Sequence, residues 1–340
     1  VRVAKLEKNA STIKFWGEAR VRYQSGYKGK IDSGDVNHSR FQERIRVYTK
    51  ADLNDKASFY GRLVSEWTSS NNNSTTQNAD IIWDYGYFEW KFTPEFKFDV
   101  GRLALNGAYS MFNTNGGYDG AQFLYNNGKF AGKLAYGDAG NYVNGQSDTK
   151  SGYSQEILFV DANYKFTDKF SMNAALFNSA NDSNTVNANK EYAYKVWTVG
   201  FQSKLNEDFT FTGAYLSNTA KRAKLYNGDK TPDGWYANLW YKGADAAKVG
   251  SWGLNLNYRN IKAHALDANK LSGVFGNSVV DTDLWSIYGV KGWGFQANYT
   301  ISKNAILTAT YETLNRNNSN LADGTAKLKP FYYLQMNVYF

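Results

Sequence analysis

Hydrophobic and polar side chains alternate along most of this chain with a period of two. The alternation begins after residue 12 and is clearest in residues 13–24, 209–215, 252–259 and 305–312. Successive side chains of a β-strand point to opposite faces of the sheet, so the pattern predicts strands with one apolar face and one polar face. We find neither long helical patterns nor a strand–helix–strand rhythm, so the chain is expected to be all-β.

The connections between these strands alternate between short and long. Short turns are expected at residues 53–56, 93–95, 126–128, 167–169, 205–208, 243–248 and 302–304. Longer polar stretches are expected at residues 25–39, 69–80, 103–118, 139–151, 179–191, 218–232, 260–281 and 315–327. This count predicts about sixteen antiparallel strands. Short periplasmic turns and long extracellular loops are typical of transmembrane β-barrels of the outer membrane.

The composition is compatible with such a barrel. The mean hydropathy is −0.58, and the sequence contains no apolar run of the ~18 residues that a membrane-spanning helix needs. A barrel strand exposes only every second side chain to lipid, so a hydrophilic average does not exclude it. Aromatic residues flank the short turns, as in Phe92, Phe96, Phe166 and Phe170, which is typical of a membrane-interface girdle. A soluble sandwich or propeller is the alternative, but it would need a second packing layer.

The first residues differ from the rest. Val3, Leu6 and Ala10 have the spacing of a helical seam, so residues 1–11 are predicted to be the end of a helical or coiled-coil stalk, or a leader, and residues 12–340 the barrel. A disordered leader with chance spacing is the alternative. Because the chain starts at Val1 without a signal peptide, we expect a mature or trimmed piece.

The last strand ends the chain on an aromatic residue. One face of this strand carries five apolar or aromatic side chains: Tyr332, Leu334, Met336, Val338 and Phe340. A terminal alternating strand that ends in Phe resembles the signal by which the barrel-assembly machinery recognises outer-membrane proteins. We therefore expect these residues to act as a membrane-insertion signal.

Three segments carry a resemblance to a known family: residues 14–20 (KFWGEAR), 99–102 (DVGR) and 334–340 (LQMNVYF). With sixteen strands and a Phe terminus, the sequence resembles the OmpM-like porins of diderm Firmicutes, and the architecture resembles general sixteen-stranded porins. The resemblance implies a homotrimer in the outer membrane with a passive, water-filled pore. It also implies that the full-length protein tethers this membrane to peptidoglycan through an S-layer-homology domain, which this chain lacks.

If the apolar faces meet lipid, the opposite faces line the lumen, and those of the first three strands are strongly basic. The candidate pore-lining and constriction residues are Lys14, Glu18, Arg20, Arg22, Arg44, Arg46, Tyr60, Arg62, Glu66, Arg102 and Asp119. Arg102 is a special case, because strict alternation points it outward and a lumen position requires a bulge at Gly101.

The resemblance to general porins implies that one long loop, residues 103–118, folds into the lumen opposite the basic wall. The loop is rich in Asn and Gly, and Asp119 is the acid nearest to it. Together with the formal net charge of +8, this favours a modest anion preference for a general diffusion pore that passes small hydrophilic solutes and ions. In the alternative, cross-strand pairs with Glu18, Glu66, Glu89 or Asp99 cancel the selectivity.

Two other functions stay open. Inward-pointing aromatic side chains at Trp16, Tyr60, Tyr236 and Trp240 could make the pore a specific oligosaccharide channel. A barrel with a restricted pore could instead serve mainly as a structural tether.

Enzyme chemistry is not expected. The two histidines, His38 and His264, fall in predicted outer loops, and no HExxH, GxSxG or P-loop spacing occurs. Asp281 and Asp283 could hold Ca²⁺, but two carboxylates without a third ligand are more often a solvated loop. We therefore predict no catalytic residue, no metal and no cofactor.

The basic residues alternate along strands and form no recognisable nucleic-acid module, so no nucleic-acid partner is expected. The lipid bilayer and lipopolysaccharide are the expected partners outside the pore. Three basic residues of one outer loop are candidates for contact with lipopolysaccharide phosphates: Lys221, Arg222 and Lys224.

Overall fold

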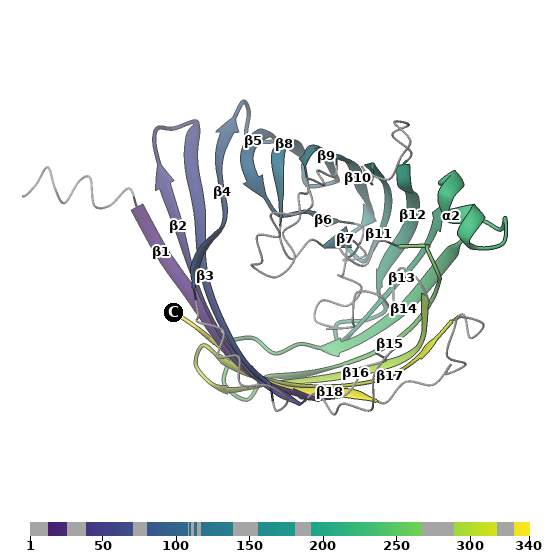
Figure 1. The fold of residues 1–340 in the computed structure, drawn as a ribbon. Coiled ribbons are helices and arrows are strands. Elements are labelled where there is room, and N and C mark those ends of the chain that lie inside the picture. The colour runs from purple at the N-terminus through teal and green to yellow at the C-terminus, as the bar shows by residue number, and fades with distance from the viewer. Residues whose placement is uncertain are drawn as a thin grey trace, which may run out of the picture.

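The chain forms a closed antiparallel barrel (Figure 1). The computed structural model describes residues 13–25, 39–70, 80–107, 109, 112–113, 117–138, 156–180, 192–266, 289–317 and 330–340. Each barrel strand pairs with its neighbours in the chain, and β1 (Ile13–Ser25) closes the ring by pairing with β18 (Phe331–Tyr339). The predicted all-β barrel is confirmed, and the barrel contains 16 strands.

The remaining elements follow in chain order. The other barrel strands are β2 (Arg40–Asp52), β3 (Ala57–Ser70), β4 (Ile81–Lys91), β5 (Phe96–Leu103), β8 (Tyr118–Asn126), β9 (Phe130–Asp138), β10 (Glu156–Thr167), β11 (Phe170–Ala180), β12 (Tyr192–Lys204), β13 (Phe209–Asn218), β14 (Asp233–Lys242), β15 (Trp252–Lys262), β16 (Gly289–Ser302) and β17 (Ala305–Arg316). The elements outside the barrel wall are β6 (Asn106–Gly107), β7 (Phe112–Asn113) and α2 (Lys221–Tyr226).

The short turns lie where the sequence places them, and side-chain oxygens stabilise them. In the turn between β2 and β3, the Asn54 Oδ1 accepts hydrogen bonds from the backbone N–H groups of Lys56 and Ala57, each at 2.9 Å. Asn206 accepts from Asp208 and Phe209 in the same way between β12 and β13. Such Asn side chains satisfy backbone donors that the strand ladder leaves unpaired, which ends one strand and starts the next.

The inner face of the wall can be traced from residue to residue. β6 and β7 lie inside the ring of strands (Figure 1), and Tyr109, between them, forms a hydrogen bond with Ser171 of β11. Residues that pair across neighbouring strands share a face. Following the pairs around the barrel from Ser171 leads to Phe331 on β18. Gln335, four residues farther along β18 and on the same face, pairs with Arg22 on β1. Glu18, Arg20 and Arg22 of β1 therefore lie on the same face of the wall as Ser171.

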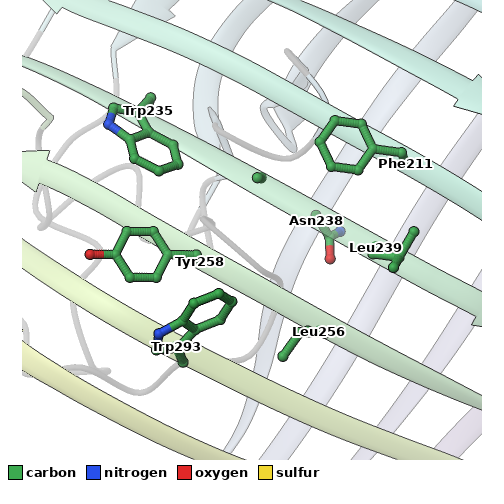
Figure 2. Close-up of a pocket in the computed structure, with 8 residues that line it drawn as sticks. Phe211, Trp235, Asn238, Leu239, Leu256, Tyr258 and Trp293 are labelled. Carbon is green, nitrogen blue, oxygen red and sulfur yellow. The ribbon is translucent and has the colours of Figure 1, made fainter.

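The outer face is apolar and rich in aromatic rings. Phe15 and Ile45 are 70% and 53% exposed on it. Beside the short turns the rings pair, with centroid distances of 5.4 Å for Phe92 and Phe96 and 5.8 Å for Phe166 and Phe170. Figure 2 shows a recess in the wall of β13 to β16. Its lining is formed by Phe211, Trp235, Ala237, Asn238, Leu239, Leu256, Tyr258 and Trp293.

The end of the chain is part of the closure. The backbone N–H of Gly17 donates to the Phe340 carbonyl at 2.7 Å, and the N–H of Phe340 donates to the Gly17 carbonyl at 3.0 Å. A Cβ at Gly17 would lie 2.5 Å from the Phe340 ring, so the ring covers the bare glycine backbone. The five residues of the predicted insertion signal alternate along β18 and its end with inward-facing residues such as Gln335.

One outer connection differs from its prediction. Residues 218–232 were expected to be a polar loop, but Lys221–Tyr226 forms the helix α2. Ala220, the N-cap of this helix, and Ala223 within it are buried, at 1% and 3% exposure. These small apolar residues stabilise the turn of helix by packing against the rim of the barrel at β12. The polar composition of residues 218–232 gives no indication of this packing. In the described part of the chain, no helix is long and apolar enough to cross a membrane.

Candidate pore

The connection between β5 and β8 folds into the barrel (Figure 1), as the resemblance to general porins implies. Its β6 and β7 form a separate two-stranded sheet inside the ring, on the side of β8 to β13 (Figure 1). A Cβ at Gly107 would lie 2.4 Å from the ring of Phe159. The glycine thus lets the loop backbone approach the wall at β10 closely.

Tyr109 fixes this loop to the wall through three hydrogen bonds. Its hydroxyl is 2.8 Å from the Ser171 Oγ and accepts from the Asn163 Nδ2 at 3.0 Å. The hydroxyl of Tyr236, on β14, donates to the Tyr109 carbonyl at 2.8 Å. The Lys133 ammonium adds a bond of 2.7 Å to the Asn106 carbonyl. The loop is therefore anchored to strands on one side of the barrel.

Apolar packing supports the same attachment. Besides the polar groups that bond to the loop, the inner wall on this side carries a cluster of buried apolar side chains. Members of this cluster include Leu103, Leu105, Tyr118, Phe159, Phe177, Leu216 and Tyr236. Sequence alternation alone could not identify this cluster, because it shows that a side chain points inward but not whether water or a loop covers it.

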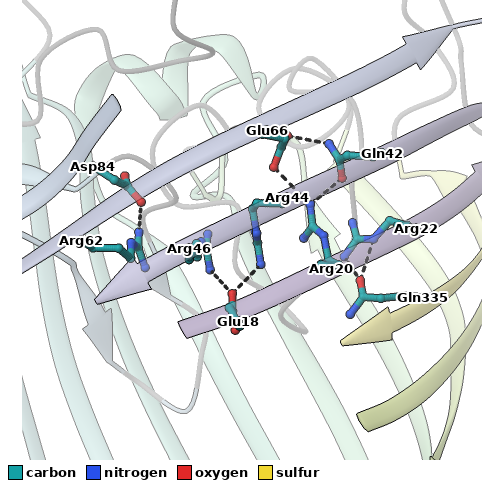
Figure 3. Close-up of polar contacts among 10 residues, drawn as sticks. All are labelled: Glu18, Arg20, Arg22, Gln42, Arg44, Arg46, Arg62, Glu66, Asp84 and Gln335. Carbon is teal, nitrogen blue, oxygen red and sulfur yellow. Dashed lines mark hydrogen bonds and ion pairs between the residues drawn. The ribbon is translucent and has the colours of Figure 1, made fainter. Parts of the chain in front are cut away.

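The other side of the barrel carries the arginine cluster, which we define as Arg20, Arg22, Arg44, Arg46 and Arg62 (Figure 3). The Glu18 Oε1 accepts from Arg44 at 3.0 Å and from Arg46 at 3.1 Å. Arg20 donates to the Gln42 Oε1 at 2.6 Å and lies 3.2 Å from the Glu66 carboxylate.

Two arginines of the cluster have partners that the sequence did not indicate. Arg62 pairs with Asp84 because the register between β3 and β4 is irregular between Arg62 and Leu63. Arg22 donates from Nε to the Gln335 Oε1 at 2.7 Å and lies 4.5 Å from the ring centroid of Tyr333. Strict alternation does not place Asp84 inward, so only a known register could reveal this pair.

The cluster carries more positive than negative charge. Its five guanidinium groups share three carboxylates, those of Glu18, Glu66 and Asp84. Glu89 forms salt bridges with Lys91 and Lys97 instead, and Asp99 accepts from the Gln122 side chain. The cross-strand pairing considered as an alternative thus exists for Glu18 and Glu66, while Glu89 and Asp99 have other partners.

Arg102 and Asp119 lie away from this cluster. The register of β5 with both neighbours runs through Gly101 without a shift, so the bulge that an inward Arg102 requires is not formed. Arg102 shares the face of Val100, which is the outer face. There it forms two hydrogen bonds with Asp119, of 2.9 and 2.6 Å. Both residues therefore lie on the outer face of the wall and not on the lumen face.

The remaining candidates are distributed over two walls. Lys14 and Tyr60 lie on the inner face near the turns, opposite Lys50 in the register of β1, β2 and β3. Trp16 lies on the same wall, whereas Tyr236 binds the loop and is 3% exposed.

A second buried polar group on the inner face was not found from the sequence. The Arg259 side chain on β15 is fully buried and pairs with Glu312 on β17. Asn257 accepts from the same guanidinium at 3.5 Å. An alternation pattern signals that Arg259 faces inward, but it does not distinguish a solvated lumen charge from a buried ion pair.

The candidates for histidine and metal chemistry are described only in part. His264 follows β15, and burial lowers the pKa of its imidazole below the usual value. Among the residues that the structure describes, no group of three or more His, Asp or Glu side chains is arranged to hold a metal ion. His38, Asp281, Asp283 and the predicted stalk at residues 1–11 lie outside the described residues, and the side chain of Arg222 is likewise not described.

The fold is similar to that of solved porins. A triple mutant of Rhodopseudomonas blastica porin aligns with a TM-score of 0.57 and 14% identity over 96% of this chain and all of the porin. Salmonella typhi OmpF, in a complex with daunomycin, aligns with a TM-score of 0.61 and 13% identity over 96% of this chain and 97% of that chain. No family model and no curated protein sequence matches the chain. Identities this low show the fold alone, so membership of the OmpM-like family stays a prediction.

Proposed function

We propose that the chain is a general diffusion porin of the outer membrane of a diderm bacterium, with a water-filled pore along the arginine cluster. The observation that carries this proposal is the one-sided attachment of the inward loop. Tyr109 holds it against β10, β11 and β14, whereas the polar cluster belongs to β1 to β4. The likeness to porin structures and the apolar outer face support the membrane location.

We propose a modest anion preference for this pore. The three carboxylates of the cluster offset only part of the charge of its five guanidinium groups, and Arg20 and Arg44 are held by fixed partners rather than extended into the lumen. A fixed positive charge on one wall raises the local concentration of anions relative to cations. Pairing keeps the preference modest, because each ion pair has a weak field at a distance.

The assembly around the barrel follows from the same proposal. The chain forms a homotrimer in lipid, receives help from the barrel-assembly machinery, and contacts lipopolysaccharide through Lys221 and Lys224 of α2. Tethering to peptidoglycan belongs to an S-layer-homology domain outside this chain. Chemical cross-linking of the detergent-solubilised barrel tests the trimer, and a ladder that stops at the monomer contradicts it.

Planar bilayers test the pore and its selectivity together. In a KCl gradient we expect stable single-channel currents and a reversal potential on the anion-selective side. Glu18→Gln leaves Arg44 and Arg46 without their shared carboxylate, so it should increase the anion preference. Glu95→Gln removes the same charge from an exposed turn, where Glu95 accepts a hydrogen bond from Thr93, and should leave the reversal potential unchanged.

Three results contradict the proposal in different ways. A barrel without conductance rules out the porin function and favours the structural tether. A clear cation preference of the natural sequence rules out the selectivity argument alone. An equal shift in both variants means that net charge, rather than the cluster, sets the reversal potential.

A further inference from the structure

Below the arginine cluster, the inner wall of β1 and β2 carries a stacked pair of aromatic rings. Trp16 and Tyr48 face each other in the register, with centroids 5.6 Å apart and planes within 5° of parallel. The backbone hydrogen bonds between β1 and the end of the chain reach Gly17 and Phe340, and the register partner of Trp16 itself in the described part of the chain is Tyr48 on β2. The Trp16 side chain is 42% exposed, which leaves ring surface available to a solute.

The ring surface continues across β3 and β4. Tyr60 and Tyr87 stack with centroids 5.1 Å apart and planes 12° from parallel, and Tyr85 lies 6.3 Å from Tyr87. The Arg62 guanidinium joins the two groups, since it lies 5.7 Å from the Tyr48 ring and 4.0 Å from the Tyr85 ring. We call these six residues, with Arg62 at the centre, the aromatic track: Trp16, Tyr48, Tyr60, Arg62, Tyr85 and Tyr87.

Positively and negatively charged side chains border the aromatic track. Tyr48 lies between Arg46 and Lys50 on the same face of β2, about 7 Å along the strand from each. Arg46 is paired with Glu18, at 3.1 Å, and Lys50 with Asp52, at 2.8 Å. The rim therefore offers hydrogen-bond donors and acceptors beside the rings, with cationic groups in excess because Arg44 and Arg46 share Glu18.

We propose that the aromatic track is a binding subsite for neutral hexose oligosaccharides on their way through the pore. The C–H face of a pyranose ring is apolar and packs on an aromatic ring, whereas its hydroxyl groups form paired hydrogen bonds with guanidinium and carboxylate side chains. The ion pairs Arg46–Glu18 and Lys50–Asp52 offer fixed donors and acceptors to such hydroxyl groups. Several rings in succession across four strands suit an oligomer better than a single sugar. This assignment rests on the proposed porin function, because the track is useful only in an open lumen.

The other wall of the barrel provides the contrast. Trp240 occupies an inward position on β14, where its register partners are Thr210 and Asn255 rather than aromatic residues. Tyr236 on the same strand is taken up by the inward loop. The large inward aromatic side chains of β14 therefore form no track with those of β1 to β4.

Block of the ion current by sugars tests the assignment. Single channels in planar bilayers are exposed to increasing concentrations of maltohexaose, and separately to polyethylene glycol of the same hydrodynamic size. We expect a saturable block by maltohexaose and a weaker, linear effect of the polymer, which has no ring face. Trp16→Leu should raise the half-saturating concentration of maltohexaose about tenfold, equivalent to the loss of one good ring contact. Tyr85→Leu, on another strand, should raise it as well.

Trp240→Leu is the matched control, and its half-saturating maltohexaose concentration should equal that of the natural sequence. The assignment is overturned if maltohexaose acts like the polymer, or if Trp240→Leu weakens the block as much as Trp16→Leu. Failure of the porin function is distinguishable, since it removes the ion current itself. A conducting channel without saturable block refutes the sugar subsite and leaves the general porin intact.

Discussion

The hydroxyl of Tyr236 is predicted to hold the inward loop in place, and Tyr236→Phe removes that hydroxyl with little change of shape. The phenol donates to the Tyr109 carbonyl at 2.8 Å, and the Tyr236 side chain is 3% exposed. An intramolecular hydrogen bond contributes about 1 kcal/mol net, and the carbonyl left without its donor raises the cost to about 1–2 kcal/mol. The fraction of time that the loop spends detached should therefore rise roughly five- to thirtyfold.

Single-channel recording measures this change directly. We expect Tyr236→Phe to show more frequent excursions to a higher conductance, because the loop occupies part of the lumen only while it is docked. The urea midpoint for unfolding of the barrel should shift little, since the strand ladder is unaffected. Tyr241→Phe, which removes a hydroxyl from the outer face of the same strand, is the control. If the two variants give the same excursion frequency, the reasoning about the Tyr109 anchor is refuted.

Three further predictions concern the stability of the barrel. Asn206→Ala removes the acceptor of two turn hydrogen bonds, of 2.9 and 2.8 Å, so the free energy of unfolding in detergent should fall by about 1 kcal/mol; an unchanged urea midpoint would show that water replaces the side chain without cost. Gly101→Ala should lower the free energy of unfolding by about 2–4 kcal/mol, because Gly101 has a φ of +135° and a Cβ there would lie 2.5 Å from the Gly86 carbonyl oxygen. Its yield of refolding into vesicles should therefore fall. Gly243→Ala, which has open space around the added Cβ, should refold with normal yield, and equal yields for the two variants would contradict the prediction. Burial lowers the pKa of His264, so the unfolded chain binds the proton more readily, and the free energy of unfolding should decrease as the pH falls through about 6.5, the unfolded value. Asn tolerates the local φ of 60°, so His264→Asn should lose less stability than the natural sequence between pH 7.5 and pH 5. Identical pH profiles for the two proteins would disprove the contribution of His264.

The strand positions and the turns could be predicted from the sequence because both have local causes. The alternation of β1 follows from the one-sided contact of each side chain, and Asn54 and Asn206 form their turns with backbone groups two or three residues away. The same alternation assigns Glu18, Arg20 and Arg44 to one face, and the register of β1 and β2 puts the three residues side by side. It also indicates the outward position of Arg102, and the Gly101 bulge expected as an exception is not formed.

The interior required the tertiary structure. Asp84 meets Arg62 only because the β3–β4 register is irregular at that point, and the aromatic track exists only because register brings Trp16 to Tyr48 and Tyr60 to Tyr87. Likewise, an inward tyrosine reads the same whether it faces water or, like Tyr236, a docked loop.

The sequence by itself therefore determined the period, the number of strands, the position of the short turns and the sign of the charge on the first strands, since these depend on neighbours in the chain. Only the tertiary structure decided which inward side chains pair, which are covered by the loop and which remain open to the lumen. Those properties depend on the register between strands and on the path of the inward loop, both of which are set by contacts between residues far apart in the chain, such as those of Tyr109 with Ser171 and Tyr236.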